Sequence, residues 1–173
     1  MENLSLLETL YREHFRRIYN YAYMRLLDEA AAEDVTQEVF LAAFTAIERF
    51  DPARGSSKAW LYKIAANLVT NYRKLARSRR EISVGAVPET AFEETFDTEG
   101  PLGQTDNLRA ERILAKLSEG ERELLAMRYA MGLTNEEIGR SIASNAAAVS
   151  QRFSRLLKKC RCLDAGAKSN MKN

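Results

Sequence analysis

The sequence has 173 residues, of which 46% are hydrophobic and 29% are charged, which is ordinary for a soluble globular protein. The N-terminus lacks a basic segment followed by an apolar one, and residues 39–47, the longest mostly apolar run, are too few to cross a bilayer. A single histidine argues against a His-based metal site or a catalytic triad, and Cys160 and Cys162 are best explained as reduced thiols. We therefore expect a cytoplasmic protein without membrane insertion, metal or cofactor.

The net charge of +2 is unevenly distributed along the chain. Residues 1–80 have a net charge of +3 and residues 109–173 a net charge of +6, whereas residues 81–108 contain seven acidic residues and no Lys or Arg. Two basic parts with an acidic connector suggest two modules that face nucleic acid and a tether that does not.

Apolar residues at helical spacing predict a first helix over residues 4–27 and a second from about 31 to 49. In the second helix, apolar residues cover most of the circumference, and such a helix is normally buried. They are Val35, Val39, Phe40, Ala42, Ala43, Phe44, Ala46 and Ile47. The polar residues share one narrow stripe, which either binds a partner or is simply solvated. They are Asp34, Gln37, Glu38, Thr45 and Glu48.

Residues 50–57 form a loop by composition, with Pro, Gly and two Ser in eight residues. The loop leads into a helix predicted over residues 60–80, which contains no Pro or Gly. The loop is either a simple connector or one wall of a pocket for a flipped base, since it lies next to Trp60.

The helix over residues 60–80 has two stripes. The apolar stripe consists of Leu61, Ile64, Leu68, Tyr72 and Leu75. The polar stripe consists of Trp60, Lys63, Asn67, Asn71 and Lys74, and Arg77, Arg79 and Arg80 follow it. Cations can bind phosphate, amides can reach base edges and an indole can stack on an unpaired base. The helix therefore suits either a nucleic-acid surface or a core helix with a solvated basic face.

Residues 81–106 lose helical periodicity, which predicts a linker and a domain boundary. Helices are expected over 108–117 and 121–131, with Gly132 as a C-terminal cap. Capping boxes are expected at two places. They are the pairs Ser118 with Glu121 and Thr134 with Glu137.

Asn145 is expected to cap a basic helix over residues 146–161, after a short helix that ends near residue 142. Two helices joined by a tight turn indicate a helix-turn-helix, and Gly139 lies where its two helices must approach closely. A helical hairpin with a solvated basic face is the alternative. We expect an all-α protein of two small helical domains joined by an acidic flexible linker, the second domain ending in a helix-turn-helix. The expected divisions are 1–80, 81–107, 108–165 and a disordered tail over 166–173.

Three segments in this order resemble the extracytoplasmic-function (ECF) sigma factors of the major bacterial sigma family. They are DVTQEVFLAAF at 34–44, WLYKIAANLVTNYRK at 60–74 and LSEGERELLAMRYAMGLTNEEIG at 117–139. The resemblance implies a specificity subunit of RNA polymerase without catalytic residues of its own, serving a stress or envelope-response regulon. It implies that a core-binding face docks on the clamp helices of the largest polymerase subunit. This face would consist of Asp34, Gln37, Glu38 and Leu41.

The resemblance also implies which residues bind promoter DNA. At the downstream, minus-ten element, the loop 50–58 would hold an extruded base and the following helix would face the separating strands and their phosphates. The residues are Trp60, Lys63, Asn67, Asn71, Arg73, Lys74, Arg77, Arg79 and Arg80. The linker would thread the polymerase active-site cleft, and the helix-turn-helix would read the upstream, minus-thirty-five element and touch the polymerase flap. Family members usually also bind an anti-sigma factor.

The chain departs from the family pattern in its last motif. Ala143 stands where the family usually has Gly, Ser144 where it has a hydrophobic residue, and 148–150 where it commonly has Thr-Val-Lys. The start of the recognition helix offers almost no donors for base edges, so we predict weak or shape-based reading of the upstream element. The residues expected there are Asn145, Gln151, Arg152, Arg155, Lys158 and Lys159.

Two other classes of protein are compatible with parts of the sequence. A free-standing helix-turn-helix regulator explains the two basic parts but not the polar stripe of residues 34–48 or the acidic connector. An all-helical enzyme could use Glu33, Asp34 and Glu38 as metal ligands, but no second carboxylate cluster of convincing spacing accompanies them.

Overall fold

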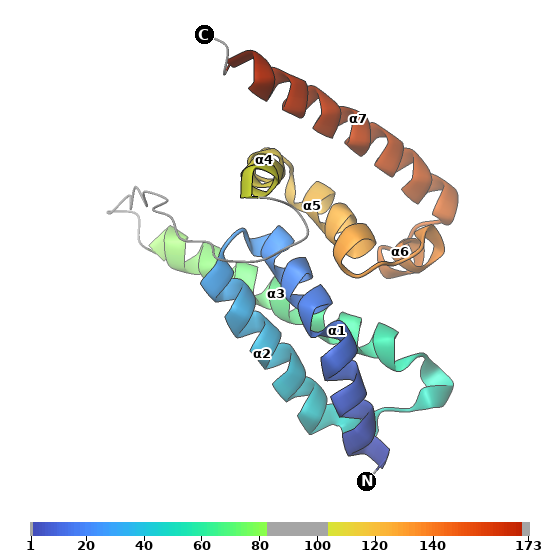
Figure 1. Ribbon diagram of the computed structural model, residues 1–173. Coiled ribbons are helices and arrows are strands. Elements are labelled where there is room, and N and C mark those ends of the chain that lie inside the picture. The colour runs from blue at the N-terminus through green and yellow to red at the C-terminus, as the bar shows by residue number, and fades with distance from the viewer. Residues whose placement is uncertain (1, 83–103, 171–173) are drawn as a thin grey trace.

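The computed structural model describes residues 2–82 and 104–170, and within these two ranges the regular elements are all helical (Figure 1). The all-α prediction is therefore confirmed. The first range contains α1 (Glu2–Leu26), α2 (Glu29–Ala46), the 3-10 turns η1 (Ile47–Arg49) and η2 (Pro52–Arg54), and α3 (Ser57–Ile82). The second contains α4 (Gln104–Ala115), α5 (Glu119–Leu125), the π-helical turn η3 (Ala126–Ala130), α6 (Asn135–Ser141) and α7 (Ala146–Asn170).

Three helices form the first domain around one apolar core. α1 ends at Leu26, and Leu27 after it has a φ of +54°. Asp28 then caps α2, because its carboxylate accepts a hydrogen bond of 2.8 Å from the Ala31 backbone N–H. This cap lets α2 turn back and pack against α1, and α3 packs against both. The fully buried residues at the centre are Ile18, Tyr21, Ala22, Val35, Val39, Leu61, Ala65 and Val69.

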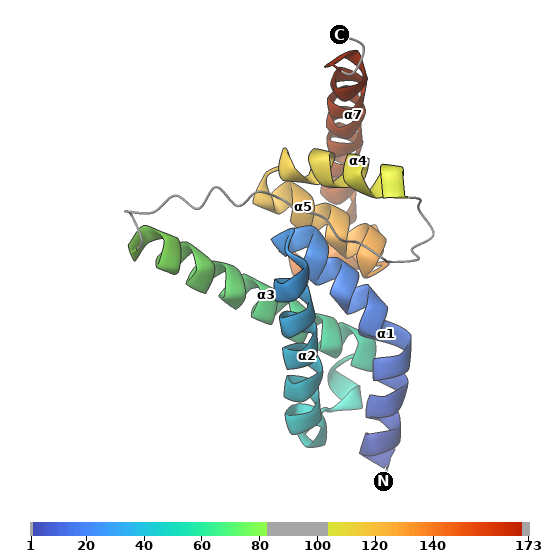
Figure 2. The ribbon, with the colours of Figure 1, turned by 60° about the vertical axis from the view of Figure 1, so that its left-hand side comes forward.

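The buried face of α3 differs in phase from the predicted apolar stripe. Only Leu61 of that stripe is buried, while Tyr72 and Leu75 are 36% and 60% exposed. The physical reason is that the C-terminal half of α3 extends beyond the domain, where no helix covers those residues (Figure 2). The residues that α3 does bury are Leu61, Tyr62, Ala65 and Val69.

The second domain follows the predicted caps closely. Both capping boxes form, because the hydroxyls of Ser118 and Thr134 accept from the backbone N–H groups of Glu121 and Glu137, and these glutamates accept in return. Gly132 follows η3 with a φ of +67°, which favours glycine. The core of this domain is formed mainly by Leu124, Met131, Ile138, Val149, Phe153 and Leu156.

Helix ends differ from the expected boundaries around the linker and the tail. α3 continues to Ile82 and α4 begins at Gln104, so both ends of the expected linker are helical, and its central part lies outside the described residues. α7 continues to Asn170 instead of ending near residue 161, so residues 166–170, where we predicted a disordered tail, belong to that helix.

The two domains pack against each other in this structure. α1 lies against α5 and η3, as both ribbon views show (Figures 1 and 2). The contact joins segments distant in sequence, and the buried side chains of both domains form one continuous cluster.

Candidate nucleic-acid interface

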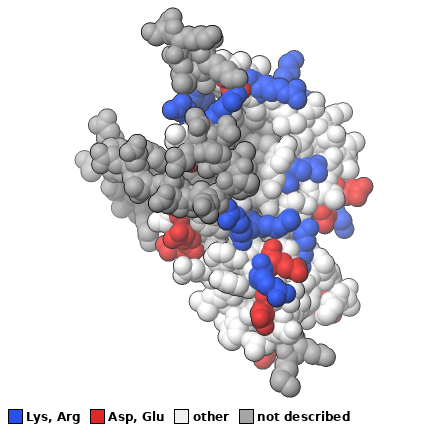
Figure 3. All heavy atoms as spheres, in the orientation of Figure 1, with Lys and Arg blue, Asp and Glu red and all other residues white. Residues whose placement is uncertain are grey.

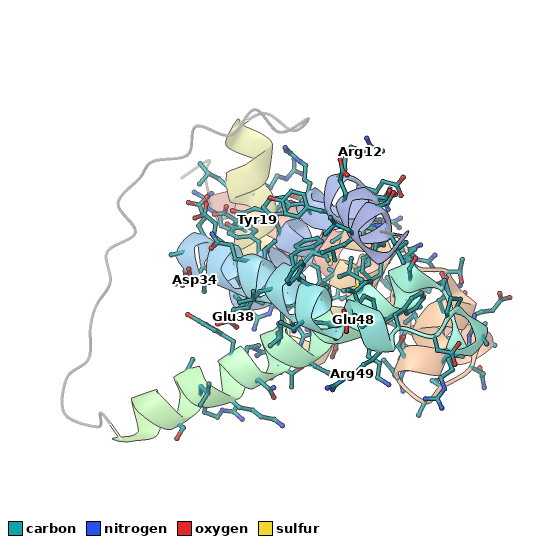
Figure 4. The ribbon with its side chains drawn as sticks, turned by 90° about the horizontal axis from the view of Figure 1, so that it is seen from below. Arg12, Tyr19, Asp34, Glu38, Glu48 and Arg49 are labelled. Atoms are coloured by element: carbon teal, nitrogen blue, oxygen red, sulfur yellow. The ribbon has the colours of Figure 1, made fainter. Side chains whose placement is uncertain are left out.

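The outer face of α2 combines acidic, amide and apolar side chains. Asp34, Gln37 and Glu38 are all exposed, and Figure 4 shows Asp34 and Glu38 on the same outer side of the helix. Leu41 and Phe44 beside them are 65% and 55% exposed. The burial that we expected for Phe44 is therefore wrong, because α2 contacts other helices only on the opposite face, which includes Val35, Val39 and Ala43.

The polar stripe of α3 is exposed along its length. Lys63, Asn67, Asn71 and Lys74 are exposed, and Trp60 at the start of the stripe is partly buried. The Trp60 ring lies 5.2 Å from the ring of Phe50, measured between centroids. The structure therefore places an indole, two amides and two ammonium groups in line on one surface.

The loop before α3 is built from local hydrogen bonds. The Asp51 carboxylate accepts from the Ala53 backbone N–H at 3.0 Å, and the Ser56 hydroxyl accepts from the Ala59 backbone N–H at 3.2 Å. These two caps fix the path of the exposed residues 51–56 next to Trp60. The loop is thus an ordered turn at the edge of the α3 stripe.

The arginines of α3 that are predicted to bind phosphate differ in exposure and in their partners. Arg77 is exposed, but Arg73 is only 21% exposed in its side chain and forms an ion pair with Glu119 of α5. The side chains of Arg79 and Arg80 lie outside the described residues. One predicted phosphate ligand is therefore paired with a carboxylate of the other domain.

The helix-turn-helix consists of α6 and α7. Its turn brings the backbone of the two helices close together, because a Cβ placed on Gly139 would lie 2.8 Å from the Ser144 carbonyl oxygen. Ala143 in the turn has a φ of +51°, in the left-handed region that glycine favours. Asn145 caps α7 as expected, its Oδ1 accepting from the Ala148 backbone N–H at 2.8 Å.

The predicted upstream residues lie along one helix but do not all have the same surroundings. Gln151, Arg152, Arg155 and Lys158 are exposed, whereas the ammonium of Lys159 donates to both carboxylate oxygens of Glu121 at 2.7 and 2.9 Å. This interaction lowers the pKa of Glu121. A groove of about 560 Å³ lies between α5 and α7. Its lining includes Leu124, Met127, Leu156, Arg152, Arg155 and Lys159.

Lys and Arg do not form a continuous band on the face drawn in Figure 3. Basic side chains there are interspersed with acidic ones. On this face, opposite charges are therefore adjacent, and no broad patch of one sign is visible among the described residues.

Sequence reasoning missed several charged residues at the contact between the domains. Arg25 is buried, and its guanidinium lies 2.8 Å from Glu123 and 3.8 Å from Glu119, both in α5. Its Nη1 also donates to the Tyr21 hydroxyl at 3.0 Å, and burial raises the pKa of Tyr21 to about 12. A lone arginine within the apolar repeat of the first helix was the available signal.

Two further side-chain contacts join neighbouring helices close to the α3 and α7 surfaces. The Tyr23 hydroxyl donates to Glu111 of α4 at 2.6 Å, and burial raises the pKa of Tyr23. The Arg128 guanidinium lies 5.0 Å from the centre of the Phe153 ring and donates to the Asn135 side chain. Arg128 thereby joins η3 to α6 and α7.

No helix in the described part of the chain is both long enough and apolar enough to cross a membrane. Within the same residues, no group of three or more His, Cys, Asp and Glu side chains is placed to hold a metal ion.

Two family models match separate parts of the sequence. Sigma-70 region 2 matches residues 10–80, and Sigma-70, region 4 matches residues 107–160. The chain therefore belongs to the sigma-70 family, whose members are specificity subunits of RNA polymerase and not catalytic enzymes.

The curated relatives place the chain among the ECF sigma factors. It is 30% identical over 140 residues to the ECF RNA polymerase sigma factor BldN of Streptomyces coelicolor, an alignment that covers 81% of this chain and 53% of that protein. It is 28% identical over 152 residues to the ECF RNA polymerase sigma factor SigK of Mycobacterium tuberculosis, covering 86% of this chain and 80% of SigK. The chain thus spans about half of the length of BldN.

Two solved structures have the same fold. The sigma factor RpoE in a complex with the anti-sigma factor NepR from Bartonella quintana matches with a TM-score of 0.69 and 22% identity, covering 90% of this chain and 94% of that one. CnrH in a complex with the cytosolic domain of CnrY matches with a TM-score of 0.64 and 24% identity, covering 91% and 86%. Both alignments include the two domains found here.

Proposed function

We propose that this chain is an alternative sigma factor that binds the RNA polymerase core enzyme, recognises and melts promoter DNA and starts transcription of a stress or envelope-response regulon. The observation that supports this best is the polar stripe of α3, where two amides and two lysines are exposed in line with a partly buried indole beside an ordered loop. In this proposal, residues 1–80 bind core and the minus-ten element, 81–107 link the domains and 108–165 bind the minus-thirty-five element.

The core-binding surface is proposed to be the outer face of α2. Exposed Leu41 and Phe44 supply apolar area, and Asp34, Gln37 and Glu38 supply a polar margin. An apolar centre with a polar rim is the usual composition of a protein interface. The proposed partner is the clamp helices of the largest polymerase subunit.

The α3 stripe is proposed to capture the downstream element as a single strand. Unstacking a base costs a few kcal/mol, and stacking on an aromatic ring returns about 1–3 kcal/mol per base. Trp60 and the loop before it would receive the extruded base, and Asn67 and Asn71 would contact base edges. The cations Lys63, Lys74 and Arg77 would bind phosphates, as would Arg79 and Arg80. Arg73 would join them once it is released from Glu119.

The upstream element is proposed to bind along α7. Gln151, Arg152, Arg155 and Lys158 are exposed there, and Asn145 and Lys159 lie at the two ends of the set. Three alanines follow Asn145, so most of the binding would come from phosphate attraction and DNA shape. The same domain would touch the polymerase flap.

The chain would depend on partners for both catalysis and regulation. The chain would supply no catalytic residue, since the core enzyme performs the nucleotidyl transfer. It would act in the cytoplasm and would be restrained by an anti-sigma factor, for which the solved complex of RpoE with the anti-sigma factor NepR is a precedent.

Run-off transcription tests the proposed function directly. Purified core polymerase, this protein and a promoter library would be mixed, and the initiated transcripts sequenced. We expect transcripts that share upstream and downstream elements, lost with Asp34→Arg at the core-binding step and with Trp60→Ala at the melting step. Glu8→Arg and Tyr129→Ala are matched controls, because both residues are exposed outside the proposed surfaces. A chain that never binds core would instead be a free-standing DNA-binding regulator.

A further inference from the structure

The contact between the two domains contains one deeply buried charge. The Arg25 side chain is 2% exposed, and the carboxylates beside it, Glu123 and Glu119, both come from the other domain. A buried guanidinium is tolerated when it is paired and becomes very unfavourable when its partners are removed. The packing of α5 on α1 therefore depends on these two glutamates.

One of the two glutamates also reaches the proposed DNA-binding helix. Glu119 pairs with Arg73 of α3, which lies between Asn71 and Lys74 in the sequence but is turned toward α5 and away from the exposed stripe. A carboxylate and a phosphate oxygen satisfy the same guanidinium donors. Glu119 and promoter phosphate are therefore alternative partners of Arg73, and both cannot bind it in the same way at once.

The packed arrangement is also too short for a promoter. Elements named for positions minus ten and minus thirty-five lie about 25 base pairs apart, which is about 85 Å along B-DNA at about 3.4 Å per base pair. The domains here touch through α1, α5 and η3. The 21 residues between the described parts could span about 70 Å if extended, so the chain is long enough for the domains to separate widely.

We infer that the contact of Glu119 and Glu123 with Arg25 and Arg73 is an intramolecular latch, which holds the free protein closed and occupies a DNA-binding arginine until core polymerase or promoter replaces it. This inference rests on the proposed function, because it takes α3 as a DNA-binding helix. It adds that the second domain inhibits the first through specific ion pairs. Opening exchanges carboxylate partners for water, polymerase or phosphate.

The distance between the domains tests the latch without polymerase or DNA. Spin labels on Cys162 of α7 and on Ser5→Cys of α1, in a Cys160→Ser background, would report it by double electron–electron resonance in the full chain; Ser5 and Cys162 are both exposed. Ser5 lies near the start of α1 and Cys162 in the C-terminal half of α7, toward opposite ends of the molecule (Figure 1), so we expect one narrow distribution for the parent and a shifted, much broader one for Glu119→Gln/Glu123→Gln. Glu136→Gln, an exposed change on α6, is the matched control and should leave the distribution narrow.

Exchanging the charges of Arg73 and Glu119 distinguishes opening of the domain contact from unfolding of the variant. Arg73→Glu should open the protein, and Arg73→Glu/Glu119→Arg should close it again, with circular dichroism confirming helix content in each. A parent that is already broad, or a double Gln variant with the parent's distribution, overturns the latch whatever the protein does in transcription.

Core-polymerase binding then tests the inhibitory role. The proposed core-binding face of α2 is exposed in the closed form, so closure can inhibit only because the clamp helices and the flap must engage separated domains. If the closed form is about nine-tenths of the parent, opening it should then raise the apparent affinity for core about tenfold, because affinity scales with the competent fraction. Glu119→Gln/Glu123→Gln should show this gain and Glu136→Gln should not. An open variant with unchanged core and promoter affinity overturns inhibition, whereas no core binding by any variant refutes the proposed function and leaves the distance result standing.

Discussion

The two helices proposed to face DNA expose very different side chains. α3 presents Trp60 with two amides and two lysines in line, whereas α7 begins with a cap residue and three alanines. The Oδ1 of Asn145 is already used by the Ala148 backbone N–H. Base edges are read by side-chain donors and acceptors, and phosphates by charge. Sequence recognition should therefore be concentrated in the first domain, with the second supplying mainly electrostatic attraction.

The largest effect is expected from a substitution that disrupts the helix-turn-helix of the second domain and leaves the first domain unchanged. Gly139→Ala places a Cβ 2.8 Å from the Ser144 carbonyl oxygen, so the turn between α6 and α7 must shift. We expect a loss of about 1–3 kcal/mol in the free energy of unfolding, measured by urea denaturation. Upstream-element dependence should fall with it, while the first domain keeps its contacts.

Gly120→Ala is the control for this change. A Cβ at that position has no atom within 4 Å, and the residue lies in the first turn of α5. Its stability should equal or slightly exceed that of the parent. Equal stability of the Gly139→Ala protein would show that α6 and α7 are not closely packed.

A single-base scan of a target promoter compares the two helices directly. Changes in the downstream element should each cost about 1–3 kcal/mol in the free energy of open-complex formation, as mismatches at read positions usually do. Changes in the upstream element should each cost less than about 1 kcal/mol, because the start of α7 offers few donors. Penalties of several kcal/mol at single upstream bases would contradict the comparison.

Ala143→Gly should relieve backbone strain in the turn that precedes α7. The φ of +51° at Ala143 is unfavourable for a residue with a Cβ. We expect a gain of up to about 1 kcal/mol in the free energy of unfolding, partly offset by the greater freedom of glycine in the unfolded chain. Ala147→Gly, within the first turn of the helix, should destabilise by a similar amount. A loss of stability in Ala143→Gly would mean that the left-handed conformation is not adopted.

The smallest expected effect is on the pH dependence of stability, and it involves the first domain only. Burial lowers the pKa of His14, whose Nδ1 lies 3.1 Å from the Tyr62 hydroxyl. Because the folded pKa is below the unfolded one, about 6.5, this stabilisation is present above that pH and is lost as pH falls through the folded pKa. Thermal unfolding between pH 7 and pH 5 should show a small loss for the parent that His14→Gln lacks. An identical pH dependence in both proteins would exclude this role.

Much of the fold and of the candidate site was predictable from local signals. Capping boxes at Ser118 and Thr134, the cap at Asn145 and the close approach at Gly139 all appear as expected, because each depends on residues within about one turn of the chain. The exposed stripe of α3 was likewise readable from helical spacing, since residues three and four apart share a face.

Tertiary structure decided which parts of those helices are covered. Periodicity marks an apolar arc but does not say where a neighbouring helix ends. Phe44, in a helix expected to be buried, and Tyr72 and Leu75, in the apolar stripe of α3, are therefore exposed. The position of Arg25 within an apolar repeat signals a buried charge, but nothing in the sequence indicates that Arg25 and Arg73 pair with Glu119 and Glu123. Long-range ion pairs depend on the packing of two domains, and a charge pattern along one chain does not specify which domain faces which.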